Sequence, residues 1–179
     1  MADIVILQGS VRKNGNTQRL AQEFLRGASE NNNVKMISIG AYNINPCTGC
    51  NSCFERDGHK CFQNDDMSKI YELLMKADIL VVASPVYFYG ISAQLKALVD
   101  RLHTPMRNEF NVKKMALFLV GAATLPDMFE PINLQYELIL RFFKLEDIGR
   151  IFVDGVKDIG DIKGNKALDD AYKLGLSIR

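Results

Sequence analysis

Residues 79–83 read Ile-Leu-Val-Val-Ala, and a loop of mixed character, Ser84-Pro85-Val86-Tyr87-Phe88-Tyr89-Gly90, follows them. Apolar residues at consecutive positions predict a strand with both faces buried, as in the middle of a parallel sheet. Segments of helical spacing lie on either side, at about residues 67–77 and 92–102. The stretch therefore predicts the central strand of a sheet whose strands alternate with helices.

The same alternation extends in both directions along the chain. Four more strands are expected at residues 4–7, 34–39, 114–120 and 150–153, and further helices at about 17–29, 128–144 and 163–176. Alternating strands and helices wind into a parallel sheet with helices on both faces. We therefore expect one α/β domain over residues 1–179, a doubly wound five-stranded parallel sheet of order 2-1-3-4-5, which is the flavodoxin-like arrangement.

Composition excludes several classes of protein. The chain has 179 residues, 24% of them charged, and a net charge of +1, so it is neither a basic nucleic-acid-binding protein nor an acidic disordered chain. No apolar run approaches the roughly 18 residues of a membrane span. The first ten residues, MADIVILQGS, lack a basic region and a cleavage site of the kind that a signal peptide has. We expect a cytoplasmic protein without nucleic-acid or membrane partners.

Ligands of doubly wound sheets bind outside the carboxyl ends of the strands, where the winding reverses. The first loop there, residues 9–17, reads Gly-Ser-Val-Arg-Lys-Asn-Gly-Asn-Thr. Its glycines, the donors of Ser10, Asn16 and Thr17, the cation of Arg12 and a helix N-terminus suit a phosphate. The spacing fits neither a Walker loop nor the dinucleotide fingerprint, so a terminal monophosphate is the expected ligand. A plain strand-to-helix turn with a capping side chain is the alternative.

Two further loops lie at the same edge of the predicted sheet. The loop after residues 79–83 carries consecutive aromatic residues that cannot all point into one core, so we expect one to face the crevice as a platform for a flat ligand. The alternative is that Tyr87 and Phe88 pack under the next helix. The loop after the fourth strand, Gly121-Ala122-Ala123-Thr124, is small enough to admit a ring, although a simple turn has the same composition.

Together these segments resemble the NADPH-dependent FMN reductase branch of the flavodoxin-like superfamily. The matching pieces, in chain order over roughly the first two thirds of the sequence, are residues 9–17, Pro46 to Cys61, Asp65-Asp66-Met67, Ser84 to Phe88, and Ser92 to Lys96 with Asp100-Arg101. The resemblance implies one bound FMN, with its phosphate on the loop that holds Ser10, Arg12, Gly15, Asn16 and Thr17. It places the flavin ring against Pro85, Val86, Tyr87, Phe88 and Gly121.

All four cysteines lie in the expected irregular loop over residues 41–65, at Cys47, Cys50, Cys53 and Cys61. This spacing resembles the compact motif of the iron–sulfur flavoproteins, which implies a [4Fe–4S] cluster beside FMN, and two-residue gaps allow three thiolates to converge on one cluster. Zinc, reversible disulfides and four reduced thiols without metal remain open.

The resemblance implies an enzyme. It would pass electrons from NAD(P)H, or from a ferredoxin-like donor through the cluster, to a small acceptor such as a quinone or flavin. No side chain is expected to act as a catalytic base, because the flavin itself carries the chemistry. The family also implies a homodimer or homotetramer. The alternative function is a non-enzymatic electron carrier or a thiol redox-sensing module.

Overall fold

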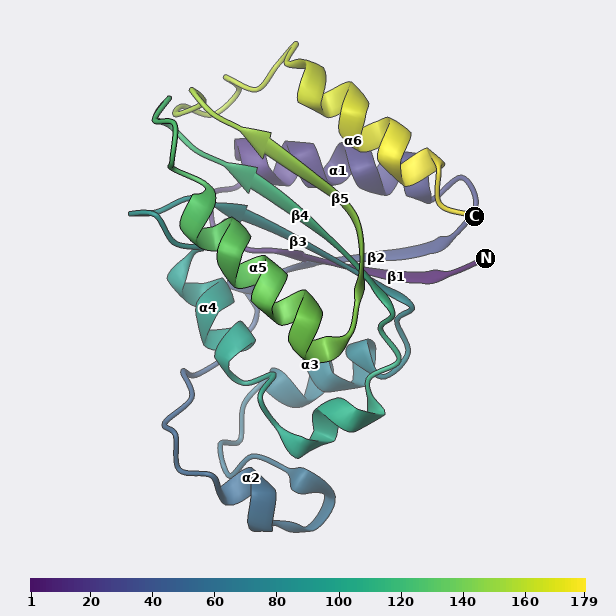
Figure 1. Cartoon of the computed structure of the whole chain (residues 1–179), viewed down its shortest axis with the longest axis vertical. Coiled ribbons are helices and arrows are strands. Elements are labelled where there is room, and N and C mark those ends of the chain that lie inside the picture. The colour runs from purple at the N-terminus through teal and green to yellow at the C-terminus, as the bar shows by residue number, and fades with distance from the viewer.

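A five-stranded parallel sheet forms the centre of the computed structural model, which describes residues 1–179 (Figure 1). The strand order is β2-β1-β3-β4-β5, as the sequence predicts. The strands are β1 (Asp3–Gln8), β2 (Asn33–Ser38), β3 (Ile79–Pro85), β4 (Lys114–Val120) and β5 (Glu146–Val153). All four strand pairs are parallel, so every carboxyl end reaches the same edge of the sheet.

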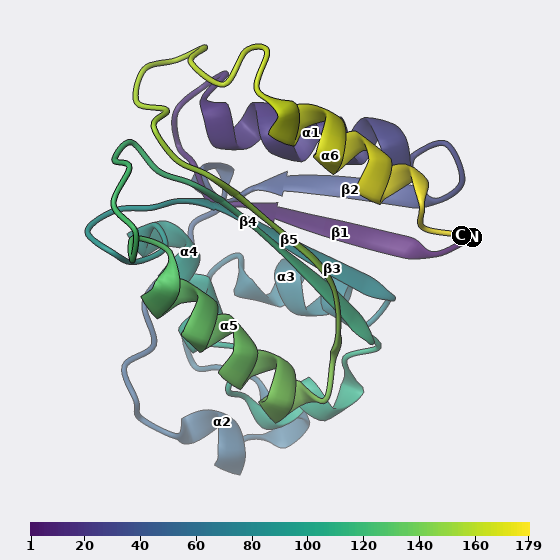
Figure 2. The same cartoon turned by 45° about the horizontal axis from the view of Figure 1, so that its top comes forward.

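Helices cover both faces of the sheet, which confirms the predicted doubly wound arrangement. One face carries α1 (Asn16–Ala28) and α6 (Lys166–Leu176), and the other carries α3 (Met67–Leu74), α4 (Ala93–Asp100) and α5 (Glu130–Phe143), as Figure 2 shows. The cysteine segment holds two short helical turns, α2 (Ser52–Glu55) and η2 (Asp57–His59), and it projects away from the sheet. Two other 3-10 turns are η1 (Ile39–Ala41) and η3 (Pro105–Glu109). None of the helices is both long and apolar enough to cross a membrane.

Every residue of β3 is buried, which confirms the expectation drawn from its unbroken apolar run. Side chains of β3 alternate between two hydrophobic clusters, one on each face of the sheet. Val81 belongs to the cluster that holds Leu20 and Phe24 of α1, whereas Leu80 belongs to the one that holds Leu95 and Leu98 of α4. The two clusters fix the sheet between its helices and hold the loops at the carboxyl edge in place.

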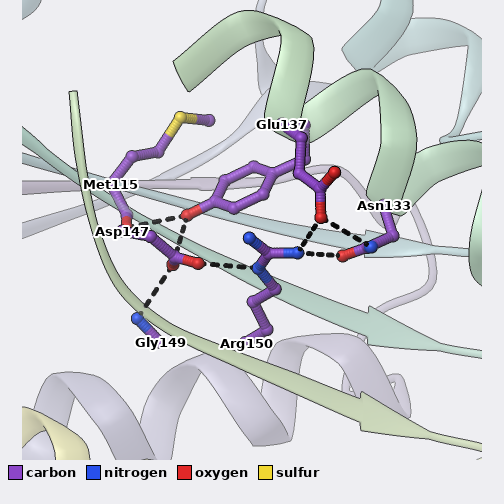
Figure 3. A network of polar contacts seen from close by, with 7 residues as sticks. Met115, Asn133, Glu137, Asp147, Gly149 and Arg150 are labelled. Carbon is purple, nitrogen blue, oxygen red and sulfur yellow. Dashed lines mark hydrogen bonds and ion pairs between the residues drawn. The ribbon is translucent and has the colours of Figure 1, made fainter. Parts of the chain in front are cut away.

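Strand β5 begins at Glu146, four residues before the predicted start. It is an edge strand with mostly half-exposed or exposed side chains, so it lacks the apolar run that identifies inner strands. Its charged residues belong instead to a polar network with α5 (Figure 3). Arg150 contacts Asp147 of the same strand and Glu137 and Asn133 of α5, with nitrogen–oxygen distances of 2.6–2.7 Å.

The hydroxyl group of Tyr136 on α5 completes this network. It lies 2.8 Å from the carbonyl oxygen of Met115 and 2.9 Å from the carboxylate of Asp147, and the tyrosine is 2% exposed. Burial and the bonded carboxylate both raise the pKa of Tyr136. The hydroxyl therefore stays protonated and joins α5 to β4 and β5 at a place where the ladder between these strands is irregular.

We expect Tyr136→Phe to lower the free energy of unfolding by about 1–2 kcal/mol, because the carbonyl oxygen of Met115 loses its hydroxyl donor and the Asp147 carboxylate loses one of its three donors. Urea unfolding followed by circular dichroism measures the change. Tyr42→Phe is the control, since the Tyr42 hydroxyl has no hydrogen-bond partner, and it should change stability little. Equal unfolding midpoints for Tyr136→Phe and the unsubstituted protein would contradict the assigned role.

Candidate functional site

A hollow of about 220 Å³ lies at the carboxyl edge of the sheet, between the loops that follow β1, β3, β4 and β5. Eight of the ten residues that the sequence assigns to a cofactor line it. These are Ser10, Arg12, Gly15, Asn16, Thr17, Pro85, Val86 and Tyr87. The fold thus gathers segments that are some 70 residues apart in the chain, at the position where doubly wound sheets bind ligands.

The first loop presents donors toward this hollow. Ser10, Asn16 and Thr17 are buried, and α1 begins at Asn16. No side chain caps the first turn of α1, whose preceding residue is Gly15. The backbone N–H groups there are unpaired donors at the positive end of a helix dipole, so this turn suits an anion.

Two side chains of the loop also bind the connection between β5 and α6. Arg12 donates to the carbonyl oxygen of Lys157 at 3.0 Å. The Asn16 amide donates to the carbonyl oxygen of Asp158 at 2.8 Å and accepts from the N–H of Gly160 at 3.0 Å. Asn16 therefore holds two loops together, a role that its position in the first loop alone did not reveal.

This connection adds residues to the site that the sequence pattern did not indicate. Val156, Lys157 and Ile159 line the hollow, and Ala122 joins them from the loop after β4. The order of the strands could have predicted them, because in a parallel sheet the loop after the fifth strand leaves at the same edge as the other loops. Lys157 is the second basic residue, with Arg12, among those that line the hollow.

The loop after β3 forms a tight two-residue turn with an aromatic tip. Tyr87 and Gly90 exchange two backbone hydrogen bonds of 2.9 and 3.0 Å. Between them Phe88 and Tyr89 have φ values of 48° and 63°, a left-handed conformation that this kind of turn usually gives to Asn and Gly. Phe88 is 98% exposed and Tyr89 is 46% exposed. Residues other than glycine that are held in this conformation cluster at functional sites.

Two buried serines fix this loop against the first one. Ser92, 1% exposed, donates from its hydroxyl to the carbonyl oxygen of Gly9 at 2.7 Å, and its N–H donates to the Ser84 hydroxyl at 3.0 Å. A side chain at Gly9 would lie 2.9 Å from the Ser92 hydroxyl, so glycine permits this close approach. The two loops are therefore held at a fixed distance from each other.

Phe88 and Gly121, which the family resemblance assigned to the cofactor, are not among the residues that line the hollow. Phe88 projects from the tip of its turn into solvent. A Cβ atom at Gly121 would lie 2.4 Å from the methyl carbon of Met128, which is the end of a flexible side chain. Neither position contributes to the hollow itself.

The four cysteines are free thiols on the projecting segment between Asn45 and Asp65. Cys47 and Cys50 are exposed, whereas Cys53 and Cys61 are half-buried. A hydrogen bond with Ser52, at 3.3 Å between sulfur and oxygen, lowers the pKa of the Cys50 thiol. No three His, Cys, Asp or Glu side chains are grouped as metal ligands in this structure.

A buried ion pair fixes both ends of this cysteine segment. Arg101, at the end of α4, pairs with Asp65, and their side chains are 3% and 1% exposed. The same Asp65 carboxylate accepts from the N–H of Asn45 at 2.9 Å and from that of Met67 at 3.2 Å. Arg101 also donates to the carbonyl oxygen of Asn45 at 3.3 Å. One pair of charges thus joins the beginning of the segment to its end.

This pair makes stability depend on pH. Burial by itself raises the pKa of Asp65, but hydrogen bonds from Arg101, Asn45 and Met67 outweigh burial and lower the pKa below its ordinary value of 3.8. A carboxylate with a lowered pKa contributes stability above its unfolded pKa, and this contribution is lost as pH falls through the folded pKa. We expect the stability difference between the unsubstituted protein and Asp65→Asn to shrink as pH falls from 6 to 3.

Urea unfolding at several pH values measures that difference. Asp169→Asn, which alters an exposed carboxylate without a hydrogen-bond partner, is the control and should follow the unsubstituted protein. A difference for Asp65→Asn that stays constant over this range would show that the Asp65 charge contributes nothing to stability.

Comparison with known proteins identifies the family. Residues 2–146 match the sequence model of the family described as NADPH-dependent FMN reductase, which is most of the chain. The chain belongs to this family. An iron–sulfur flavoprotein of Methanocaldococcus jannaschii is 40% identical over 111 residues, which cover 62% of this chain and 56% of that protein. The chain spans about half the length of the curated iron–sulfur flavoproteins that it matches.

Two other similarities extend over nearly the whole chain. A Bacillus subtilis protein, named for an NAD(P)H-dependent FMN-containing oxidoreductase, is 26% identical over 179 residues, with 96% of this chain and 95% of that protein covered. The solved structure of an NAD(P)H:quinone oxidoreductase from Methanothermobacter marburgensis superposes with a TM-score of 0.75, at 14% identity and with 99% of each chain covered. At that identity the superposition confirms the flavodoxin-like fold alone.

The site has the features that FMN needs in an FMN reductase. A monophosphate fits the uncapped first turn of α1 with the hydroxyls of Ser10 and Thr17 and the guanidinium of Arg12, which together supply donors and no carboxylate. A flat ring fits the side lined by Pro85, Val86 and Tyr87. The hollow is smaller than the roughly 300 Å³ of pockets that enclose a ligand. A hollow of this size has room for only part of an FMN molecule.

Proposed function

We propose that the chain is an FMN-dependent oxidoreductase that passes electrons from NAD(P)H to a small acceptor such as a quinone or a flavin. The observation that carries this proposal is the hollow at the carboxyl edge, where a donor-rich loop and an apolar loop meet. Membership of the NADPH-dependent FMN reductase family supports it. When bound, FMN supplies the chemistry, because its ring accepts a hydride and gives up electrons singly or in pairs.

The chain's own residues bind and orient the cofactor. Ser10, Thr17 and the first N–H groups of α1 hold the phosphate, and Arg12, which Lys157 positions through its carbonyl oxygen, adds a cation. Pro85, Val86 and Tyr87 support one side of the ring. No titratable side chain in the hollow is needed to move a proton from a substrate, since the reacting atoms belong to the flavin.

The exposed aromatic turn favours a flavin ring that the electron donor and the acceptor can both reach directly. Tyr87, Phe88 and Tyr89 form an apolar surface beside the hollow, and the nicotinamide and the acceptor can lie against it in turn. We also propose a homodimer or homotetramer, in which a neighbouring subunit covers the part of this exposed apolar surface that the substrates leave free. No segment is dedicated to the nicotinamide, so NADH and NADPH are both candidate donors.

We also propose that Cys47, Cys50, Cys53 and Cys61 hold a [4Fe–4S] cluster, through which a ferredoxin-like donor could reduce the flavin. The chemistry of the donor set supports this assignment, because four thiols with compact spacing suit such a cluster. The names of several relatives support it as well. The thiols are not gathered in this structure, so the exposed segment must close around the iron.

Flavin binding and turnover test the proposal. Purified protein freed of cofactor is titrated with FMN, and we expect one FMN bound per chain with quenching of flavin fluorescence. Steady-state oxidation of NADPH or NADH with menadione as acceptor should follow. Flavin-loaded protein without turnover would favour the electron carrier or redox sensor instead, and failure to bind FMN at micromolar concentration would overturn the proposal.

Iron and sulfide assays with a visible absorption spectrum of anaerobically purified protein test the cluster separately. We expect about four iron and four sulfide per chain and broad absorption beside the flavin bands. Protein that shows flavin bands alone, also after anaerobic reconstitution with iron and sulfide, would remove the cluster and leave the flavin proposal intact.

A further inference from the structure

The hydrophobic cluster on the side of the sheet that α3, α4 and α5 cover is open at one end. A cavity of about 580 Å³ lies there, near the amino ends of β3 and β4, where Leu80 and Met115 line it. Its other walls come from the end of α4, the connection between η3 and β4, and the end of α5. Cavities of this size commonly hold small organic ligands. None of the lining residues belongs to the flavin hollow at the carboxyl edge, so this cavity is a separate candidate site.

The apolar side chains around the cavity are incompletely covered by the protein itself. Phe110 and Val112 before β4, and Phe143 and Leu145 at the end of α5, pack against the hydrophobic cluster and yet stay half-buried. Phe142, which also lines the cavity, is 52% exposed. Protein interiors are close-packed, and gathered apolar surface that faces a void marks a place where another molecule packs. The walls therefore suit an apolar occupant.

The polar residues of the wall indicate the charge of that occupant. Three of them are the cations Arg107, Lys113 and Lys144, the fourth is Asn108, and no Asp or Glu lines the cavity. None of the three cations takes part in an ion pair. The chain as a whole holds 22 basic and 21 acidic residues, so a wall with cations alone departs from the overall balance. An uncharged ligand would leave these cations unused, whereas a carboxylate would pair with them.

Arg107 is the cation that the structure holds in place at this wall. Its Nη1 donates to the carbonyl oxygen of Thr104 at 2.8 Å, and its Cζ lies 5.4 Å from the centre of the Phe142 ring. These contacts fix the guanidinium against the apolar side chains, while its other nitrogens make no hydrogen bond within the protein. A guanidinium with free donors suits a carboxylate, which it can bind through two parallel hydrogen bonds.

We propose that this cavity binds an amphipathic monocarboxylate of the fatty-acid class, with its alkyl chain among the apolar side chains and its carboxylate on Arg107. Lys113 and Lys144 are exposed and add positive charge at the mouth. The alkyl chain gains free energy by leaving water, and the charged end stays beside a cation, so no charge is buried without a partner. The inference depends neither on the flavin nor on the cysteines.

Decanoate and decanol share one alkyl chain and differ in charge, so together they test the inference on the whole protein. Isothermal titration calorimetry should show one decanoate bound per chain, with decanol bound at least about tenfold more weakly. FMN should bind with unchanged affinity in the presence of saturating decanoate, since the two sites share no residue. Decanoate binding is measured without FMN as well, and a failure of the proposed flavin function would leave that result intact.

Two variants locate the site. Arg107→Gln removes the fixed guanidinium and should weaken decanoate binding by about tenfold. Val112→Phe keeps the wall apolar but fills part of the cavity, and it should weaken binding similarly. Arg141→Gln is the matched control, because Arg141 is an exposed cation of α5 that does not line the cavity; its affinity should stay within about twofold of the unsubstituted protein. Circular dichroism checks that each variant is folded.

The results separate a specific site from a general effect of charge. Weaker binding in Arg107→Gln and Val112→Phe, with Arg141→Gln unchanged, supports the inference. Absence of saturable binding up to millimolar decanoate overturns it, and so does equal affinity for decanoate and decanol. Displacement of FMN by decanoate, or an equal loss of affinity in Arg141→Gln, would place the ligand elsewhere and overturn it too. If Arg107→Gln does not fold, Val112→Phe and the comparison with decanol decide.

Discussion

Replacement of Thr17 by aspartate is expected to weaken FMN binding by about 100-fold or more. Thr17 is 3% exposed, lines the hollow, and lies in the first turn of α1, where no side chain caps the free N–H groups. A carboxylate there repels a phosphate and takes over the same N–H donors. A 100-fold loss corresponds to about 2.7 kcal/mol of binding free energy, which a desolvated pair of like charges readily supplies.

The helix should still form, because the new carboxylate can accept hydrogen bonds from the uncapped N–H groups of the first turn, and these offset the cost of burying its charge. Flavin fluorescence measures the dissociation constant, and circular dichroism confirms the helix content. Thr17→Ser keeps the hydroxyl group and is the control, with an affinity expected within a few-fold of the unsubstituted protein. Binding by Thr17→Asp within threefold of that value would mean that the phosphate lies elsewhere.

The fold was predictable because burial leaves a strong mark on inner elements. Strand β3 reads as a continuous apolar run, and β4 has the predicted bounds, 114–120. The sequence predicted only the second half of strand β5. The first half of this edge strand contains polar residues such as Glu146 and Asp147, which break the apolar pattern that identifies a strand. Its first half is stabilised by contacts with α5, and these are not local in sequence.

The sequence predicted those residues of the candidate site that belong to a recognisable loop motif. It did not predict the residues that reach the site through contacts between two loops. Residues 9–17 and 84–87 each contain a local signal, and both reach the hollow. The contribution of Val156 to Ile159 depends on how the loop after β5 folds back onto Asn16, which no local pattern encodes. The family resemblance assigned Gly121 to the flavin ring, and this stays a prediction; in the fold Gly121 packs beside Met128.

Gly175→Ala is expected to destabilise the protein by about 2 kcal/mol. Helix propensity alone would predict the opposite, a gain in stability. Gly175 lies within α6, where alanine is better than glycine by about 1 kcal/mol. In the fold, however, a Cβ atom at this position would lie 2.3 Å from the backbone oxygen of Phe24 in α1. Helices α1 and α6 pack side by side (Figures 1 and 2) and must separate to admit a methyl group.

Whether Gly175→Ala lowers or raises the free energy of unfolding shows whether overpacking or helix propensity has the larger effect. Overpacking against a rigid backbone costs about 3 kcal/mol, more than the gain in propensity. Gly27 of α1 faces α6 in the same way, since a Cβ atom there would lie 2.1 Å from the backbone oxygen of Tyr172, so Gly27→Ala should behave alike. Lys173→Ala, on the exposed side of α6, is the control and should be nearly neutral. Urea unfolding decides, because a Gly175→Ala protein of raised stability would mean that the two helices are free to move apart.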